Sequence, residues 1–181
     1  MSKRDDVLNA AEQLFYQEGF HRTGVAKIAQ CANTTQRTLY KHFPSKEALI
    51  LAIMKEREAR YWACLKEVEQ QTEYSFKALV PFFALRHWNK QQHHGGCFYL
   101  HALAEYQGKN DDIVDYVRGY KRRLSEDFDT RLQQDGVSRP HLSTLLMLIY
   151  EGITASSALE LPSYTWDQTI DHVLQLLNDA R

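Results

Sequence analysis

The chain contains few residues that break helices or form cross-links. Its 181 residues include 8 glycines, 4 prolines and 3 cysteines. No run alternates strictly enough between apolar and polar residues to predict a strand, so an all-helical fold is favoured. The cysteines, Cys31, Cys64 and Cys97, are an odd and sparse set, which argues against a disulfide framework and favours free thiols in a reducing cytoplasm.

Long apolar segments are also lacking. No stretch of about 18 uncharged apolar residues occurs, so we expect no membrane span. Asp5, Asp6 and Glu12 stand where a secretory signal would need an apolar core, which again favours a cytoplasmic protein. A hydrophobic content of 44% is too high for a disordered chain, and 181 residues suffice for one or two small domains with a buried core.

Acidic residues are missing from one segment. The whole chain balances 22 Lys and Arg against 23 Asp and Glu, yet the segment from Phe20 to Lys46 holds five Lys or Arg, two His and no acid. It reads as two short helices joined by a tight turn, followed by a third helix that Ser45 caps. In binding a polyanionic duplex, the first helix braces against the backbone and the second presents its N-terminal side chains to the major groove. The segment therefore predicts a DNA-binding domain.

The same segment resembles the N-terminal helix-turn-helix domain of the TetR family of transcriptional regulators. The resemblance rests on GF-x-x-T-G-V-x-x-I-A from Gly19 and T-L-Y-x-H-F-P-S-K-E-A-L from Thr38, and covers roughly Arg4 to Arg57. Asn33 and Thr34 stand where the family usually has a Gly and an apolar residue. Because Asn tolerates the left-handed conformation better than most residues, we expect the turn to survive. Arg37 stands where a small residue is common, and adds a group able to read bases or bind phosphate.

Ten residues are assigned to the DNA surface. Gln36, Arg37 and Lys41 are expected to reach base edges, because Arg with guanine and Gln with adenine are favoured bidentate pairs. Thr38 is expected at a base methyl or a phosphate. The remaining members are four phosphate anchors (Thr23, Tyr40, His42 and Lys46) together with Lys27 and Thr35. Lys46 would act with the free N–H groups of a helix N-terminus. The alternative is an ordinary solvated polar face on a small helical bundle.

The rest of the chain predicts a second helical domain. We expect a DNA-binding domain over 1–46 and a ligand-sensing and dimerisation domain over 47–181, connected by a helix over 47–70. Pro81 must start, kink or break a helix. A polar stretch ending in paired glycines predicts a loop over 89–96. The last two predicted helices, 140–159 and 166–177, are the most apolar and need a partner surface, and the resemblance implies a homodimer through them.

Aromatic residues gather in the middle of the chain, with 13 of the 21 between residues 61 and 128. They could form an ordinary helical core or line a pocket for a small apolar or cationic ligand. The resemblance favours a pocket, because the C-terminal domain of this family senses an inducer. The candidate ligand residues are Tyr61, Trp62, Phe82, Arg86, Phe98, His101, Glu105 and Tyr120, and the sequence does not identify the ligand.

Residues able to bind a metal recur every four positions at His93, Cys97, His101 and Glu105. Beyond the paired glycines, which can break a helix, Cys97 with His101 is the one His or Cys pair at one-turn spacing. Two ligands do not make a site, so we expect no metal site and no cofactor. No nucleophile elbow, phosphate loop or dinucleotide fingerprint occurs, and we expect no enzymatic activity. Cys97 beside His94 or His101 is a candidate redox switch, with a buried inert thiol as the commoner alternative.

Together these patterns predict an all-helical, homodimeric and ligand-responsive transcriptional repressor that binds a palindromic operator. Ligand binding is expected to tilt the connecting helix and change the spacing of the two DNA-binding heads. The alternative is a helical protein-interaction adaptor without duplex specificity. It predicts no steep dependence of binding on salt.

Overall fold

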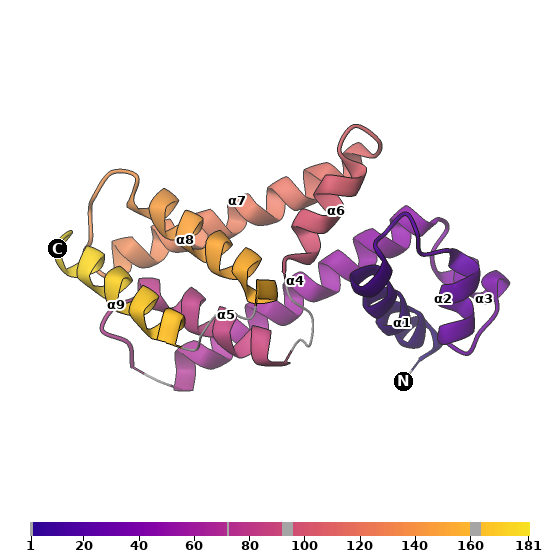
Figure 1. Ribbon diagram of the computed structural model, residues 1–181, viewed down its shortest axis with the longest axis horizontal. Helices are drawn as coiled ribbons and strands as arrows, with labels where there is room; N and C mark the ends of the chain where they lie inside the picture. Colours follow the sequence, from indigo (N-terminus) through magenta and orange to yellow (C-terminus); the bar gives the residue numbers. More distant parts are fainter. Residues whose placement is uncertain (1, 72, 92–95, 160–163) are drawn as a thin grey trace. The chain divides into compact units, whose positions relative to one another are not determined.

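The computed structural model describes residues 2–71, 73–91, 96–159 and 164–181 (Figure 1). All regular secondary structure in these residues is helical. This confirms the predicted all-helical fold. Within those residues no helix is long and apolar enough to cross a membrane. The α-helices are α1 (Lys3–Glu18), α2 (Val25–Cys31), α3 (Gln36–His42), α4 (Lys46–Gln71), α5 (Val80–Gln91), α6 (Phe98–Tyr106), α7 (Asp111–Gln134), α8 (Leu142–Ser156) and α9 (Tyr164–Asn178). Two 3-10 turns, η1 (Lys77–Leu79) and η2 (Ser157–Leu159), lie beside α5 and α8.

The chain forms two compact units. Unit 1 comprises Met1–Ala59 and Phe98–Arg118, and unit 2 comprises Arg60–Cys97 and Gly119–Arg181. Helices α4 and α7 therefore contribute residues to both units. This division differs from the predicted boundary near residue 46, because α6 and the start of α7 pack with the N-terminal helices.

Unit 1 is built on an apolar face of α1. Ser2 caps this helix in a capping box, since its side chain accepts from the Asp5 N–H at 3.2 Å while the Asp5 carboxylate accepts from the Ser2 N–H at 3.0 Å. The Phe20 ring stacks on Phe15 at 4.9 Å and meets the edge of Phe98, from α6, at 5.0 Å. The apolar face of α1 is buried and includes Val7, Ala11, Leu14 and Phe15, which recur at helical spacing.

A buried arginine, Arg57, lies within the core of unit 1. Arg57 of α4 is 3% exposed, forms an ion pair with Glu12 of α1 and donates to the Tyr16 hydroxyl at 2.9 Å. Its guanidinium also lies 5.0 Å from the centre of the Phe98 ring. Although burial disfavours the cation, Tyr16 and Glu12 more than offset it and raise the pKa of Arg57. Arg57 thus joins α1 and α4 within unit 1.

Unit 2 has a core to which α5, α7, α8, α9 and the second half of α4 all contribute (Figure 1). Pro81 is the second residue of α5, where the missing N–H costs no intrahelical hydrogen bond. The Asp135 carboxylate caps the adjacent turn η1 by accepting from the N–H groups of Lys77 at 2.6 Å and Ala78 at 2.9 Å. In the middle of the core the Tyr150 hydroxyl donates to the Tyr61 hydroxyl at 2.7 Å.

One predicted segment is corrected in part. The loop predicted over 89–96 begins later, because α5 continues through Asn89 and Lys90 to Gln91. Polar side chains carry no penalty on the solvent face of a helix, and Lys and Gln are good helix formers. Residues 92–95 lie outside the described residues, and Gly96 adopts a positive φ of 87°.

Candidate nucleic-acid interface

The turn between α2 and α3 depends on a left-handed residue. Asn33 has a φ of 52°, as its replacement of Gly predicts. Its N–H donates to the Gln30 carbonyl at 3.1 Å, and the Thr34 N–H donates to the Ala29 carbonyl at 2.9 Å. These two bonds are the Schellman arrangement, which satisfies the last carbonyls of α2. The turn consequently ends α2 sharply and sets the direction of α3.

Helix α3 is capped and oriented by its own sequence. The Thr35 hydroxyl accepts from the Thr38 N–H at 3.2 Å, which caps the helix, and Leu39 is fully buried beneath it. With Leu39 inward, the opposite side chains face solvent. In α3 and its cap, the exposed members of the predicted DNA surface are Thr35, Gln36, Arg37, Tyr40, Lys41 and His42, whereas Thr38 is half-buried.

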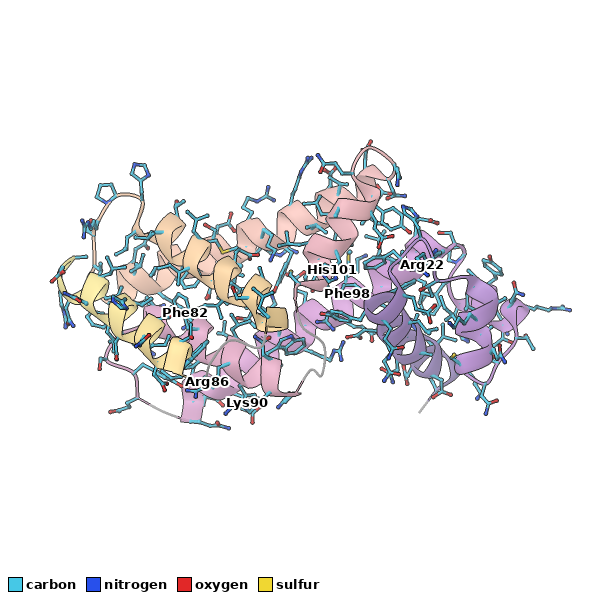
Figure 2. All side chains as sticks on the ribbon, in the orientation of Figure 1. Arg22, Phe82, Arg86, Lys90, Phe98 and His101 are labelled. Atoms are coloured by element: carbon cyan, nitrogen blue, oxygen red, sulfur yellow. The ribbon has the colours of Figure 1, made fainter. Side chains whose placement is uncertain are left out.

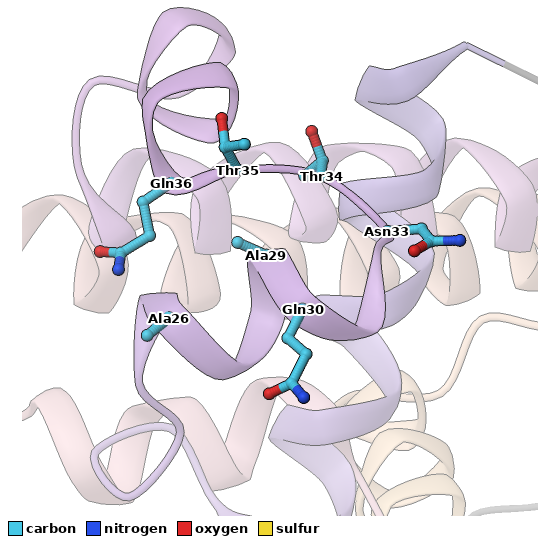
Figure 3. Close-up of a pocket in the computed structure, with 7 residues that line it drawn as sticks. All are labelled: Ala26, Ala29, Gln30, Asn33, Thr34, Thr35 and Gln36. Carbon is cyan, nitrogen blue, oxygen red and sulfur yellow. The ribbon is translucent and has the colours of Figure 1, made fainter.

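A hollow of about 540 Å³ lies between α2 and the start of α3 (Figure 3). Its floor is Ala26 and Ala29, and polar groups surround it. Because the two alanines are small, a bulky group can approach the helix-turn-helix backbone here. The polar lining residues are Gln30, Asn33, Thr34, Thr35 and Gln36.

Thr23 does not belong to the exposed surface. The sequence predicts a phosphate anchor at this position, but the Thr23 side chain is fully buried. Its hydroxyl donates to the Gly19 carbonyl at 2.7 Å and is 3.3 Å from the Leu14 carbonyl. Thr23 therefore fixes the chain between α1 and α2, with its hydroxyl bonded inside unit 1 rather than exposed.

Two of the predicted cations, Lys27 and Lys46, interact with acidic side chains. Lys27 forms an ion pair with Glu18, an acid just outside the acid-free segment. Burial lowers the pKa of Lys46, with Glu47 and Glu105 acting in the opposite direction. Lys27, Arg37 and Lys41 are all exposed, and of these three Lys27 is the one whose ammonium is paired with a neighbouring carboxylate.

The structure also reveals a residue that sequence reasoning assigned to another role. Glu105 of α6 accepts from the backbone N–H groups of Phe20, at 2.8 Å, and His21, at 2.7 Å. Gly19 allows this approach, because its φ is 84° and a Cβ there would lie 2.9 Å from Glu105 Oε1. Lys109 and the Glu105 carbonyl both lie within hydrogen-bond distance of His21 Nε2, at 3.1 and 2.9 Å. We name this contact between α6 and residues 19–21 the Glu105 clamp.

The eight predicted ligand residues divide between the two units. Phe98, His101 and Glu105 belong to unit 1, where Phe98 is core, His101 is exposed and Glu105 forms the clamp. The other five belong to unit 2, and they are Tyr61, Trp62, Phe82, Arg86 and Tyr120. Figure 2 shows Phe82 and Arg86 on α5, and Phe98 and His101 on α6. The structure therefore does not bring all eight together within one unit.

In unit 2, the aromatic side chains largely pack on one another. The centre of the Phe82 ring lies 5.5 Å from that of Phe128 and 6.2 Å from that of Tyr150. The side chains of Tyr61 and Phe82 are both buried. Arg86 is at the edge of this cluster, 3.6 Å from the Asp167 carboxylate and 5.3 Å from the Trp166 ring centre. Across the residues whose positions are described, no group of three or more His, Cys, Asp or Glu could hold a metal ion.

Comparison with known proteins identifies the N-terminal part of the chain. Residues 7–53 match the family described as bacterial regulatory proteins, tetR family. The HTH-type transcriptional regulator UidR of Escherichia coli strain K12 is 41% identical over 64 residues, which cover 35% of this chain and 33% of UidR. The match thus spans about a third of that relative. The HTH-type transcriptional repressor ComR of the same strain is 25% identical over 170 residues, which cover 85% of this chain and 79% of ComR.

The likeness extends to three dimensions. The crystal structure of SCO4454, a TetR-family transcriptional regulator from Streptomyces coelicolor, superimposes with a TM-score of 0.84 over 98% of this chain and 95% of that one, at 22% identity. At this identity the likeness supports the fold alone. The structural likeness thus gives the fold of the whole chain, and the family match gives the identity of its helix-turn-helix. Through residues 7–53 the chain belongs to the tetR family of bacterial regulatory proteins.

Proposed function

We propose that the protein is a ligand-responsive repressor that binds a palindromic operator as a homodimer. The observation that carries this proposal is the exposed face of α3, where Gln36, Arg37 and Lys41 project from a helix that Thr35 caps and Leu39 anchors. Gln and Arg provide the bidentate groups that read base edges in the major groove. The match to the TetR family likewise assigns DNA binding to this face of α3.

Phosphate contacts would flank this reading face. Tyr40 and His42 are exposed on α3, and Lys46 opens α4. The hollow beside α3 would admit part of the sugar-phosphate backbone, with the amides of Gln30 and Asn33 as hydrogen-bond donors. We place Lys46 among the phosphate contacts and Arg37 among the base contacts.

The dimer would form through α8 and α9, and an exposed apolar stripe that runs along α8 into η2 supports this. Leu145, Leu148 and Leu159 are 40%, 64% and 68% exposed, although large apolar side chains are usually buried. Gly152 and Ala155 lie between them and are also exposed. The spacing of three and four residues is that of a seam between packed helices, and small residues let two helix backbones approach closely. A second copy of this chain is the partner that closes such a stripe by two-fold symmetry.

A small ligand would act through unit 2. Its aromatic residues include Tyr61, Trp62, Phe82 and Tyr120, with Arg86 as a polar group at the edge. Ligand binding would shift the equilibrium between two arrangements of the DNA-binding heads by as much as its affinities for them differ. If operator affinity of the purified protein were indifferent to every ligand that binds it, this part of the proposal would fail.

Selection of sites from a random DNA duplex pool tests the proposal as a whole. We expect enrichment of a palindromic consensus whose half-sites lie about one helical turn apart or slightly more, because two related recognition helices would enter successive major grooves. The protein-interaction adaptor predicts no enrichment. A consensus with a single unrepeated half-site would contradict the dimer while retaining DNA binding.

A further inference from the structure

One cation of the acid-free segment lies outside the predicted DNA surface. Of the five Lys and Arg in this segment, Lys27, Arg37, Lys41 and Lys46 belong to that surface and Arg22 does not. Arg22 is exposed and lies between α1 and α2 in unit 1 (Figure 2). Across the part of the chain that the structure describes, its side chain makes no ion pair or hydrogen bond. Its guanidinium is therefore available to an outside partner.

The chain on both sides of Arg22 is fixed. Phe20 and Thr23 are fully buried, and the Thr23 hydroxyl donates to a main-chain carbonyl over 2.7 Å. His21 is held by α6, because its N–H donates to the Glu105 carboxylate over 2.7 Å and its Nε2 lies 2.9 Å from the Glu105 carbonyl oxygen. Three anchored neighbours therefore hold the backbone from which the Arg22 side chain extends.

Two carboxylates that adjoin this segment are engaged by other groups. Glu105 directs each of its carboxylate oxygens at one backbone N–H group, over 2.8 and 2.7 Å. Glu18, at the end of α1, is paired with a lysine of α2. The charged side chain nearest the His21 ring is a cation, since Lys109 Nζ lies 3.1 Å from His21 Nε2. Neither carboxylate is thus the partner of Arg22.

Arg22 immediately precedes the helix that would cross the DNA backbone. Gly24, two residues further on, is the N-cap of α2. In a helix-turn-helix the first helix crosses the sugar-phosphate backbone while the second enters the major groove. A guanidinium matches a phosphate group with two parallel hydrogen bonds. A side chain on a fixed backbone also loses less conformational freedom on binding than one on a mobile loop.

We propose that Arg22 contacts an operator phosphate beside α2, and that Glu105 is the positioning residue that holds it there. This inference rests on the proposed function. A phosphate contact carries no base information, so Arg22 contributes affinity and register on every duplex. Helix α6, which lies outside the helix-turn-helix, takes part in DNA binding through the Glu105 clamp.

The first test removes the guanidinium. Affinities of wild type and Arg22→Ala are measured at several salt concentrations, on the selected duplex and on its single-base variants. Arg22→Ala should weaken binding to all of them by about tenfold and reduce the slope of log affinity against log salt by about 1. Arg139→Ala, which removes the same charge at an exposed position of unit 2, is the matched control. Urea denaturation verifies that each variant is folded.

The outcomes of this test separate the two proposals. A wild-type protein that binds no duplex would overturn the proposed function and this inference with it. Wild-type affinity and salt slope in Arg22→Ala, as in the Arg139→Ala control, would overturn this inference alone. Altered discrimination between bases in Arg22→Ala would also contradict it, because a phosphate contact does not read sequence.

Two double cycles locate the contact and test the role of Glu105. Neutral methylphosphonates replace single phosphates of the selected duplex, and at one position of each half-site they should weaken the wild type by about tenfold and Arg22→Ala hardly at all. In a Glu105→Gln background, Arg22→Ala should cost less than about threefold, because its backbone is held less firmly. Methylphosphonates that weaken both proteins equally at every position would exclude a phosphate contact. A full tenfold loss in the Glu105→Gln background would exclude Glu105 as the positioning residue.

Discussion

The carboxylate of Glu105 accepts the backbone N–H of Phe20 over 2.8 Å, and Phe20 itself is fully buried. Through this contact and its companion at His21, α6 holds the chain segment that connects α1 with the helix-turn-helix. Hydrogen bonds to an ionised acceptor are stronger than neutral ones. The Glu105 clamp therefore fixes the DNA-binding helices to α6 within unit 1.

Replacing the Glu105 carboxylate tests this role. A Gln at position 105 would turn its NH₂ group toward one of the two N–H donors, leaving that donor without an acceptor. We expect Glu105→Gln to lower the free energy of unfolding by about 1–3 kcal/mol, measured by urea denaturation. Glu73→Gln, the same change at an exposed carboxylate, is the control and should have little effect. Equal effects of the two substitutions would show that the clamp contributes no stability.

The buried tyrosine pair of unit 2 predicts an asymmetry. The Tyr150 hydroxyl donates to the Tyr61 hydroxyl, which in turn donates to the Pro81 carbonyl over 3.3 Å. Tyr61→Phe leaves the Tyr150 hydroxyl without an acceptor in the core, and should cost about 1–3 kcal/mol in the free energy of unfolding. Tyr150→Phe removes only a donor and should cost about 1 kcal/mol or less. Chemical denaturation of both variants measures the difference, and the reverse order would contradict the direction of the bond.

Long-range polar contacts are the part of the fold that the sequence did not predict. Local signals are sufficient for features such as the left-handed Asn33, the Ser2 capping box and the buried face of α1, because each depends on residues a few positions apart. The Glu105 clamp depends on a residue 84 to 85 positions from its partners. Helical periodicity assigns a side chain to a face, but it does not say which element covers that face.

Arg57 and Thr23 illustrate the same limit. The periodicity of α4 places Arg57 in its inward stripe, but only the fold brings Glu12 and Tyr16 to its guanidinium. Thr23 lies in an acid-free, cationic segment and was expected to bind phosphate. Its hydroxyl instead bonds to carbonyls that α1 and its end supply. Composition predicted the charge of the surface, whereas packing decided which members of the segment reach it.

Acid should destabilise unit 2 through Glu69. Its carboxylate is partly desolvated, but hydrogen bonds from Arg131, at 3.3 Å, and Lys77, at 3.1 Å, outweigh burial and lower the pKa of Glu69. Because the folded-state pKa of Glu69 lies below its unfolded value, Glu69 stabilises the folded state fully above the unfolded pKa of about 4.3. This stabilisation is lost as pH falls through the folded pKa. Glu69→Gln should therefore be less sensitive to acid than the wild type. Unfolding free energies measured between about pH 3 and pH 7 decide this, and parallel curves for the two proteins would contradict it.

Charge placed on the α8 stripe should separate the proposed dimer. Leu148 is 64% exposed in the single chain and would be buried by a second copy. Leu148→Glu would bury an unpaired carboxylate, costing about 3–5 kcal/mol, so the dimer dissociation constant should rise at least about 100-fold. Sedimentation velocity over a range of concentrations measures this constant. Gln133→Glu, which adds a charge to an exposed position of α7, is the matched control. A Leu148→Glu protein that remains as dimeric as the control would exclude α8 from the interface.

The division of the DNA surface into reading and anchoring residues gives the most direct test of function. The affinities of wild type, Arg37→Ala and Lys46→Ala are measured at several salt concentrations, on the selected duplex and on variants with single base changes. Arg37→Ala should lose about 1–3 kcal/mol of discrimination at one base position. Lys46→Ala should weaken all sequences alike and reduce the slope of log affinity against log salt by about 1. Binding that is independent of salt and of sequence, or equal effects of both substitutions on specificity, would contradict a regulator that reads its operator through α3.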